Sequence, residues 1–551
     1  DGDGIGDLNG ITSRLDYIQS LGVDIIWLNP IFLSPNDDNG YDISDYREIM
    51  REFGTMEDFD RLLKEIHKRE MRLVLDLVVN HTSDEHPWFE EARKSRHNPY
   101  YNYYHWWPAE KGEPPLRLSY FDEEGNAWTY NKSTDSYYLH YFSRKQPDLN
   151  WENPEVRQEI FDMMRFWFDK GIDGFRMDSI SLIAKDPSFP LIDSKKYPDI
   201  FSFYAKEPRL HLYLHEMNRQ VLSKYDCMSV GEGSAVMVDD VAKFVDPARE
   251  ELNMLYHFDA ARIRNTTLPD NPESGIDYSL IALKKMFTEW DKAVDKGWPS
   301  IYLGNHDQPR MVSRFGSDKD EFRALSAKML ITFLLTMRGT PYWFAGDEIG
   351  MRNIRFDRIE DYNDIDTINR YKKAKAEGKD PQAVLDEQKE TGRDNARTPF
   401  QWDRSPEAGF TAGTPWLKVN PDYTWINVAD EEKDPTSILN YFKKVVSFRK
   451  ENPSLIYGSY HLLDAENPQS YTFLRKTGAD TYLIMLNFSP KAAISTPGID
   501  MSNAHVLLDN YGDRSHMAPQ KDITLRPFEA IVFQLNHPVY ESFIDSLDLL
   551  E

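Results

Sequence analysis

The chain has 551 residues, 40% of them hydrophobic, so we expect a globular protein with two or three domains. Its formal net charge of −26 argues against nucleic acid and anionic membrane surfaces as partners, because both are bound by clustered lysine and arginine. The single cysteine, Cys227, excludes an internal disulfide, and no apolar run approaches the roughly 20 residues of a membrane span. We therefore expect a cytoplasmic protein, a monomer, whose partner is a small uncharged molecule.

Short apolar runs alternate with longer amphipathic segments, such as 56–70 and 155–171, along the first 350 residues. This alternation predicts an α/β fold with a parallel sheet, either a (β/α)8 TIM barrel or a doubly wound sheet. No glycine-rich dinucleotide fingerprint follows an early strand, which favours the barrel. The predicted strands are "VDIIWLNP" (23–30), "RLVLDLVVNH" (72–81), "GIDGFRMDSI" (171–180), "DCMSVGE" (226–232), "LNMLYHF" (252–258), "PSIYLGNHD" (299–307) and "GTPYWFAGDE" (339–348).

The first ten residues, "DGDGIGDLNG", form a loop of alternating aspartate and glycine. Seven strands are predicted, whereas a TIM barrel has eight, so we interpret this loop as following a first strand that would precede residue 1. Carboxylates in this pattern can direct several oxygens at a hard cation such as Ca²⁺. The alternative interpretation is a flexible acidic tail.

Two insertions and a change of pattern divide the chain. One insertion is rich in Tyr, Trp, Pro and Asn and follows the third barrel strand, and the other is highly charged and follows the last strand. From about residue 455, apolar and polar residues alternate one by one, which predicts a small antiparallel β domain. The predicted units are the first part of the barrel (1–81), the inserted subdomain (82–150), the second part of the barrel (151–454, with the charged insertion at 351–400), the β domain (455–537) and an acidic tail (538–551).

Polar side chains stand where the predicted strands end, which is where the functional residues of a barrel cluster. A lone carboxylate at such a position is typical of a helix cap. Several acids converging on one rim would repel each other, so stability alone does not explain them. The residues are Asp76, Asn80 and His81 on one strand, Arg176 and Asp178 on the next, Glu232 on the following one, and Asn305, His306 and Asp307 later in the chain.

These strand ends carry a resemblance to a known family. "DLVVNH" (76–81), "GFRMDSI" (174–180), "GE" (231–232) and "GNHD" (304–307) follow the order of the four motifs of the α-amylase family. The resemblance narrows to the oligosaccharide α-glucosidase branch, which includes oligo-1,6-glucosidase, dextran glucosidase and sucrose isomerase. The assignment to this branch depends on the motifs "NGYDISDY" (39–46), "QPDLNW" (146–151) and "RDNARTPFQWD" (393–403). The resemblance covers residues 1 to about 537.

The resemblance implies a retaining glycosidase, in which two carboxyl groups flank the scissile bond. Asp178 would be the nucleophile and Glu232 the acid/base, and Arg176 would keep Asp178 ionised. Glu232 would need a raised pKa to hold its proton. Asp307 would be the third acid, which grips sugar hydroxyls, and two histidines would bond sugar hydroxyls beside it, His81 and His306.

The same resemblance implies a closed pocket that holds the non-reducing end of the substrate. Asp38 and Arg397 would form an ion pair behind the first glucose, and Tyr41 would stack on its ring. A closed pocket predicts exo action on short substrates. The inserted subdomain would line the mouth of the pocket with Phe121, Phe142 and Gln146.

The opening loop resembles the calcium loop of the family, Asp-x-Asn-Gly-Asp-Gly-Ile-Gly-Asp. Asp1, Asp3, Asp7 and the carbonyl of Ile5 match its later positions, with Asp1 in place of the asparagine, whereas the first aspartate of the pattern would precede residue 1. The resemblance thus implies a structural Ca²⁺ and no organic cofactor.

Two other functions remain as alternatives. One is a transglucosylase such as sucrose isomerase, whose branch carries an Arg-x-Asp-Arg-x loop, whereas this chain has "AARIRNTTLPD" (260–270) there. The other is a non-catalytic relative, which would have lost the acids and gained a membrane span. Linkage preference is left open, because Ser179, the residue after the predicted nucleophile, matches neither the Val of α-1,6-specific enzymes nor the Ala or Thr of α-1,4-specific ones.

Overall fold

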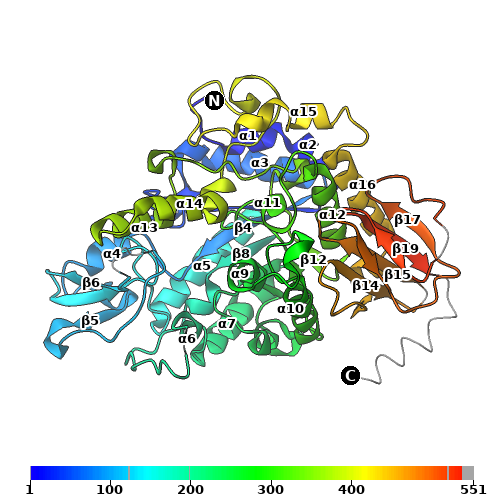
Figure 1. Ribbon diagram of the computed structural model, residues 1–551. Coiled ribbons are helices and arrows are strands. Elements are labelled where there is room, and N and C mark those ends of the chain that lie inside the picture. The colour runs from blue at the N-terminus through cyan, green and yellow to red at the C-terminus, as the bar shows by residue number, and fades with distance from the viewer. Residues whose placement is uncertain (1, 122–124, 198, 479, 518–519, 536–551) are drawn as a thin grey trace.

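The structure is a computed structural model that describes residues 2–121, 125–197, 199–478, 480–517 and 520–535. Asp1 and the predicted tail 538–551 therefore lie outside the described residues. The centre of the molecule is a parallel barrel surrounded by helices, and an antiparallel domain lies beside it, orange to red in Figure 1.

The barrel contains a strand in each of the seven predicted regions, which confirms the predicted fold class. Five of them form one parallel sheet in chain order, and the last two pair with each other. An eighth strand before residue 1 stays a prediction. The barrel strands are β1 (Ile25–Leu28), β4 (Arg72–Val78), β8 (Gly174–Asp178), β9 (Met228–Glu232), β10 (Met254–Tyr256), β11 (Ser300–Ile301) and β12 (Thr340–Pro341).

Strand register brings polar residues of neighbouring strands together at the carboxyl end of the barrel. Asp76 of β4 lies opposite Arg176 of β8, and Glu232 of β9 lies opposite Tyr256 of β10. Gly174 permits the close approach of β8 and β9, because a Cβ atom there would lie 2.2 Å from the carbonyl oxygen of Met228. The backbone register therefore places these polar residues next to one another at one end of the barrel.

The surrounding helices begin and end at residues suited to those positions. Helix α3 (Met56–Lys68) begins with a capping box between Thr55 and Asp58. Helix α5 (Pro154–Lys170) begins after Asn153, whose side chain caps it, and ends at Gly171 in the left-handed conformation (φ 106°). Both helices were predicted from periodicity. The other long helices of this layer are α7 (Arg209–Gln220), α10 (Leu280–Ala293), α12 (Arg323–Thr336) and α16 (Ile438–Glu451).

Shorter elements connect the barrel and form its insertions. The inserted subdomain contains an antiparallel sheet in the order β5-β7-β6, and the charged insertion contains two helices that pack together, α13 and α14 (Figure 1). The strands are β2 (Phe32–Leu33), β3 (Asp45–Ile49), β5 (Trp106–Pro108), β6 (Trp128–Asn131) and β7 (Ser136–Leu139). The helices are α1 (Leu8–Ser13), α2 (Leu15–Ser20), α4 (Pro87–Ala92), α6 (Phe201–Tyr204), α8 (Ala242–Val245), α9 (Asp259–Thr266), α11 (Met311–Phe315), α13 (Ile365–Ala376), α14 (Pro381–Thr391), α15 (Val428–Glu431) and α17 (Ser454–Tyr457).

The C-terminal domain is an antiparallel sheet in the order β13-β14-β15-β19-β17, with a separate pair formed by β16 and β18. Among the residues whose positions are described, none of the helices combines the length and apolar character that crossing a bilayer requires. The strands are β13 (Ser459–Leu462), β14 (Ser470–Lys476), β15 (Thr481–Asn487), β16 (Ala493–Ser495), β17 (His505–Asp509), β18 (Ile523–Leu525) and β19 (Ala530–Leu535).

Candidate active site

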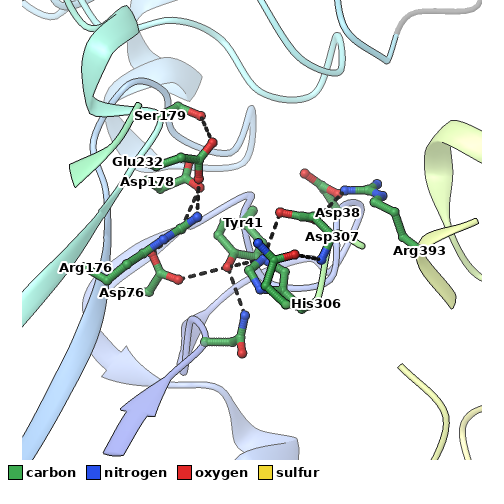
Figure 2. Close-up of polar contacts among 12 residues, drawn as sticks. Asp38, Tyr41, Asp76, Arg176, Asp178, Ser179, Glu232, His306, Asp307 and Arg393 are labelled. Atoms are coloured by element: carbon green, nitrogen blue, oxygen red, sulfur yellow. Dashed lines mark hydrogen bonds and ion pairs between the residues drawn. The ribbon is translucent and has the colours of Figure 1, made fainter. Parts of the chain in front are cut away.

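Arg176 is the centre of the polar cluster at the carboxyl end of the barrel (Figure 2). Its side chain is fully buried, and Nη1 donates to Asp76 and to Asp178 at 2.8 Å each. Nη2 donates to Glu232, and Nε donates to the hydroxyl of Tyr256 at 2.8 Å. One guanidinium therefore holds three carboxyl groups from three neighbouring strands.

The two nitrogens of this guanidinium hold Asp178 and Glu232 close to each other. Closely spaced carboxyl groups are the arrangement of retaining glycosidases, in which they lie about 5–5.5 Å apart, whereas inverting enzymes leave room for a water. Both side chains are almost fully buried, with residue exposures of 7% and 6%. This geometry suits a nucleophile and an acid/base that act on one bond.

Burial shifts the pKa of both reacting carboxyl groups upwards. Burial raises the pKa of Glu232 to about 7 and that of Asp178 to about 7, and in both cases Arg176 opposes the rise. Oε1 of Glu232 contacts two hydroxyl groups, Ser234 Oγ at 2.6 Å and Ser179 Oγ at 3.4 Å. Both hydroxyls donate to Glu232, and the Ser234 hydrogen bond lowers its pKa without offsetting burial. Arg176 likewise lowers the pKa of Asp178, as predicted, but does not offset its burial.

Asp307 forms the opposite side of the cluster. Its carboxylate lies 3.1 Å from His306 Nε2, 3.1 Å from Arg393 Nη1 and 3.2 Å from Arg397 Nη2. Burial would raise the pKa of Asp307, but these neighbours hold it well below its usual range. Asp307 is thus an anion at neutral pH and can accept hydrogen bonds from sugar hydroxyls.

The ion pair at Asp38 differs from the predicted one. Asp38 Oδ1 lies 3.5 Å from Arg393 Nη2, whereas Arg397 contacts Asp307 and donates from Nε to the carbonyl of His306 at 2.9 Å. The predicted Asp38–Arg397 pair is therefore wrong. Arg393 begins a short 3-10 turn, Arg393–Asn395, whereas Arg397 lies two residues beyond its end, and Arg393 is the one that reaches Asp38.

The predicted sugar-binding residues Tyr41, His81 and Gln146 lie beside these acids. The Tyr41 hydroxyl donates to Asp76 at 2.9 Å, and its ring is stacked on His306 with centroids 5.4 Å apart. Gln146 Nε2 donates to Asp38 at 3.1 Å and lies 3.2 Å from His81 Nε2. Burial lowers the pKa of His81 to about 3, so this imidazole is neutral.

The two phenylalanines from the inserted subdomain lie next to the same groups. The rings of Phe121 and Phe142 have centroids 5.5 Å apart, and Phe142 lies 5.1 Å from His81. The guanidinium of Arg393 stands over the Phe121 ring at 4.7 Å. The structure thus brings the predicted catalytic and sugar-binding residues, from Asp38 to Arg397, into one site.

The comparisons with known proteins agree with this geometry. The family described as alpha amylase, catalytic domain, matches residues 1–458. The chain belongs to the α-amylase family. It is 51% identical over 548 residues to an oligo-1,6-glucosidase of Parageobacillus thermoglucosidasius, covering 98% of this chain and 96% of the relative. It is 48% identical over 544 residues to an oligo-1,6-glucosidase of Bacillus cereus, covering 97% and 96%.

A solved structure has the same fold as this chain. It is a mutant of the isomaltulose synthase from Erwinia rhapontici NX5 in complex with its natural substrate sucrose, and it superposes with a TM-score of 0.92. The two sequences are 43% identical, and the match covers 97% of this chain and 96% of the other.

Several residues of this α-amylase-family site were not predicted from the sequence, among them Asp76, Tyr256 and Arg393. Asp76 was noted at a strand end, but the register that faces it to Arg176 was not known. Tyr256 lies in an apolar strand, where a tyrosine is typical of the core. Arg393 lies in the same family motif as Arg397 and could have been found as its alternative.

The described part of the N-terminal loop contains two of the three carboxylates predicted to bind calcium. Asp3 Oδ1 accepts a hydrogen bond from the backbone of Ile5 at 2.9 Å, and Asp7 Oδ1 caps α1 through Gly10 N at 2.5 Å. Asp1 lies outside the described residues. In the part of the chain with described positions, no group of three or more His, Cys, Asp or Glu could hold a metal ion. The carboxylate oxygens of Asp3 and Asp7 and the carbonyl oxygen of Ile5 are nevertheless hard donors, the type that Ca²⁺ prefers.

Proposed function

We propose that the protein is a retaining, exo-acting α-glucosidase that hydrolyses terminal α-glucosidic bonds of short isomalto- or malto-oligosaccharides or related disaccharides. The observation that carries the proposal is that one buried guanidinium, that of Arg176, contacts both Asp178 and Glu232. The family membership and the names of the relatives support the same activity.

The proposed reaction uses one carboxyl group as an anion and the other as an acid. Asp178 attacks the anomeric carbon as an anion, and Glu232 passes its proton to the oxygen of the leaving sugar. A covalent glucosyl-enzyme results. Glu232, now ionised, takes a proton from water, which attacks the anomeric carbon and releases glucose with retained configuration.

Exo action is supported by the contacts around Asp38. The ion pair between Asp38 and Arg393, together with Asp307, forms a charged boundary on one side of the reacting carboxyl groups (Figure 2). Such charges bind the hydroxyls of a terminal glucose. A chain that continued past this sugar would have to separate the ion pair.

A second candidate function is sucrose isomerisation, because the solved neighbour described above is an isomaltulose synthase in complex with sucrose. An isomerase would use the same glucosyl-enzyme and transfer it to fructose in place of water. A product time course on isomaltose, maltose, sucrose, nigerose and trehalose separates the two functions. We expect free glucose from isomaltose or maltose. Isomers of sucrose formed faster than free glucose would overturn hydrolysis as the main activity.

We also propose that the N-terminal loop binds one structural Ca²⁺ through Asp1, Asp3, Asp7 and the carbonyl of Ile5. When bound, the ion would cross-link the loop, and ligand binding to the folded form alone raises the melting temperature as its concentration rises. Calcium titration monitored by thermal unfolding tests this. An unchanged melting temperature at all calcium concentrations would overturn the proposal.

A cytoplasmic location and a monomeric state complete the proposal. The single cysteine suits a reducing compartment. Sedimentation or light scattering at micromolar concentration tests the monomer, and cell fractionation tests the location.

A further inference from the structure

The charged insertion after the last barrel strand contains a buried aspartate with two roles. Asp364 is fully buried and immediately precedes α13. Its Oδ2 accepts hydrogen bonds from the backbone N–H of Thr367 at 3.1 Å and from the Thr367 hydroxyl at 2.7 Å. This oxygen caps the helix, as aspartate commonly does at that position.

The other carboxylate oxygen of Asp364 faces the active site. Oδ1 accepts a hydrogen bond from Arg393 Nε at 2.8 Å and lies 2.5 Å from Arg393 Nη2, whereas its contact with Arg397 Nη1 is longer, at 3.8 Å. The same guanidinium also forms ion pairs with Asp307 through Nη1, at 3.1 Å, and with Asp38 through Nη2, at 3.5 Å. A cap alone would need only one carboxylate oxygen, so the second oxygen requires a different explanation.

Asp364 is itself held firmly by its neighbours. The carboxylate of Asp394 accepts hydrogen bonds from the backbone N–H groups of Asn363 at 2.7 Å and Asp364 at 2.9 Å. One turn along α13, Asn369 donates to the carbonyl of Phe121 at 2.8 Å. The start of α13 is therefore fixed against the motif that carries Arg393 and against the inserted subdomain.

Arginine has a long flexible side chain with five N–H donors in a planar fork. A carboxylate on the Nε edge fixes the plane of this fork and occupies hydrogens that do not face the substrate. The hydrogens on the other side then face Asp38, Asp307 and the terminal sugar. We propose that Asp364 is a positioning residue that orients Arg393 for recognition of the terminal glucose, which makes α13 of the charged insertion part of the substrate pocket.

This inference rests on the proposed α-glucosidase activity and is tested with the full chain. In Asp364→Asn the helix cap is retained, because asparagine caps as well as aspartate, whereas the ion pair with Arg393 is lost. The matched control is Asp380→Asn, because Asp380 caps α14, the other helix of the insertion, through Gln382 N at 2.9 Å. We expect the KM for isomaltose to rise about tenfold in Asp364→Asn, with kcat changed far less, and neither to change in Asp380→Asn.

Binding without turnover provides a second readout. In an Asp178→Asn background, the Kd of isomaltose measured by calorimetry should rise by the same factor when Asp364→Asn is added. Because Asp364 acts through Arg393, combining Asp364→Asn with Arg393→Met should raise KM no further than Arg393→Met alone. If Asp364→Asn does not fold, Asp364→Ser serves instead, because serine also caps a helix but is too short to hold Arg393.

Two results would overturn the inference. One is a wild-type enzyme that hydrolyses isomaltose or maltose while Asp364→Asn keeps the wild-type KM and Kd. The other is a double variant whose KM is the product of the two single effects. If the wild-type protein releases glucose from no α-glucoside, the proposed function fails, and the calorimetric Kd still tests whether Asp364 orients the sugar-binding arginine.

Discussion

Replacing Glu232 with glutamine should stabilise the folded protein at neutral and higher pH. Burial raises the pKa of Glu232 from 4.5 to about 7, so the folded protein keeps a proton that the unfolded chain loses at lower pH. Ionising this buried carboxyl group therefore costs folding free energy. The difference between 4.5 and about 7 corresponds to about 3 kcal/mol at pH values above 7.

The sign of the pH dependence follows from the raised pKa. Below 4.5 both the folded and the unfolded states hold the proton, so the cost is absent, and it grows as the pH rises until it is complete above about 7. Glutamine resembles the protonated acid and never ionises. The stabilisation by Glu232→Gln should therefore be largest at alkaline pH and shrink as the pH falls towards 5.

Urea unfolding of wild type and Glu232→Gln at several pH values between about 5 and 8 measures this difference through the transition midpoints. The control is Glu113→Gln, because Glu113 is exposed in the inserted subdomain. A stabilisation independent of pH, or a variant less stable than wild type at pH 8, would refute the reasoning. Either result would mean that the cluster around Arg176 holds Glu232 as an anion at little cost.

Three further changes test other parts of the site. Ser234 lowers the pKa of Glu232 through its hydrogen bond, so Ser234→Ala should move the basic limb of the kcat/KM profile to higher pH, and an unmoved limb would contradict that role. Asp178→Asn should lower kcat more than about a thousandfold while isomaltose still binds in calorimetry, and substantial residual turnover would remove it as the nucleophile. Arg393→Ala should raise the KM for isomaltose more than Arg397→Ala does, because Arg393 contacts both Asp38 and Asp307. The opposite order in steady-state kinetics would favour the pairing predicted from the sequence.

The fold was largely predictable because its signals are local. Apolar runs that end in polar residues identify the barrel strands, and the helical periodicity of segments 56–70 and 155–171 agrees with α3 and α5. The acids Asp178 and Glu232 could be found because barrel chemistry occurs where strands end. The two helices of the charged insertion were not predicted, because their surfaces are polar on most sides and carry little periodic signal.

The partners of the acids were harder to predict, because they depend on contacts between distant segments. Arg393 and Arg397 have the same chemistry four residues apart, and only the path of the chain decides which one reaches Asp38. Likewise, Asp364 precedes Arg393 by 29 residues, and no local pattern connects them. Sequence motifs therefore indicate which residues form the site, whereas the pairing among them requires the structure.

Proton NMR of the glucose first released tests the central claim most directly. Isomaltotriose is mixed with the enzyme, and the anomeric signals are followed before mutarotation equilibrates them. A retaining exo-α-glucosidase that uses Asp178 and Glu232 should release α-glucose from the non-reducing end, with isomaltose as the other early product. Initial release of β-glucose would contradict the nucleophilic role of Asp178, and early products without free glucose would contradict exo hydrolysis.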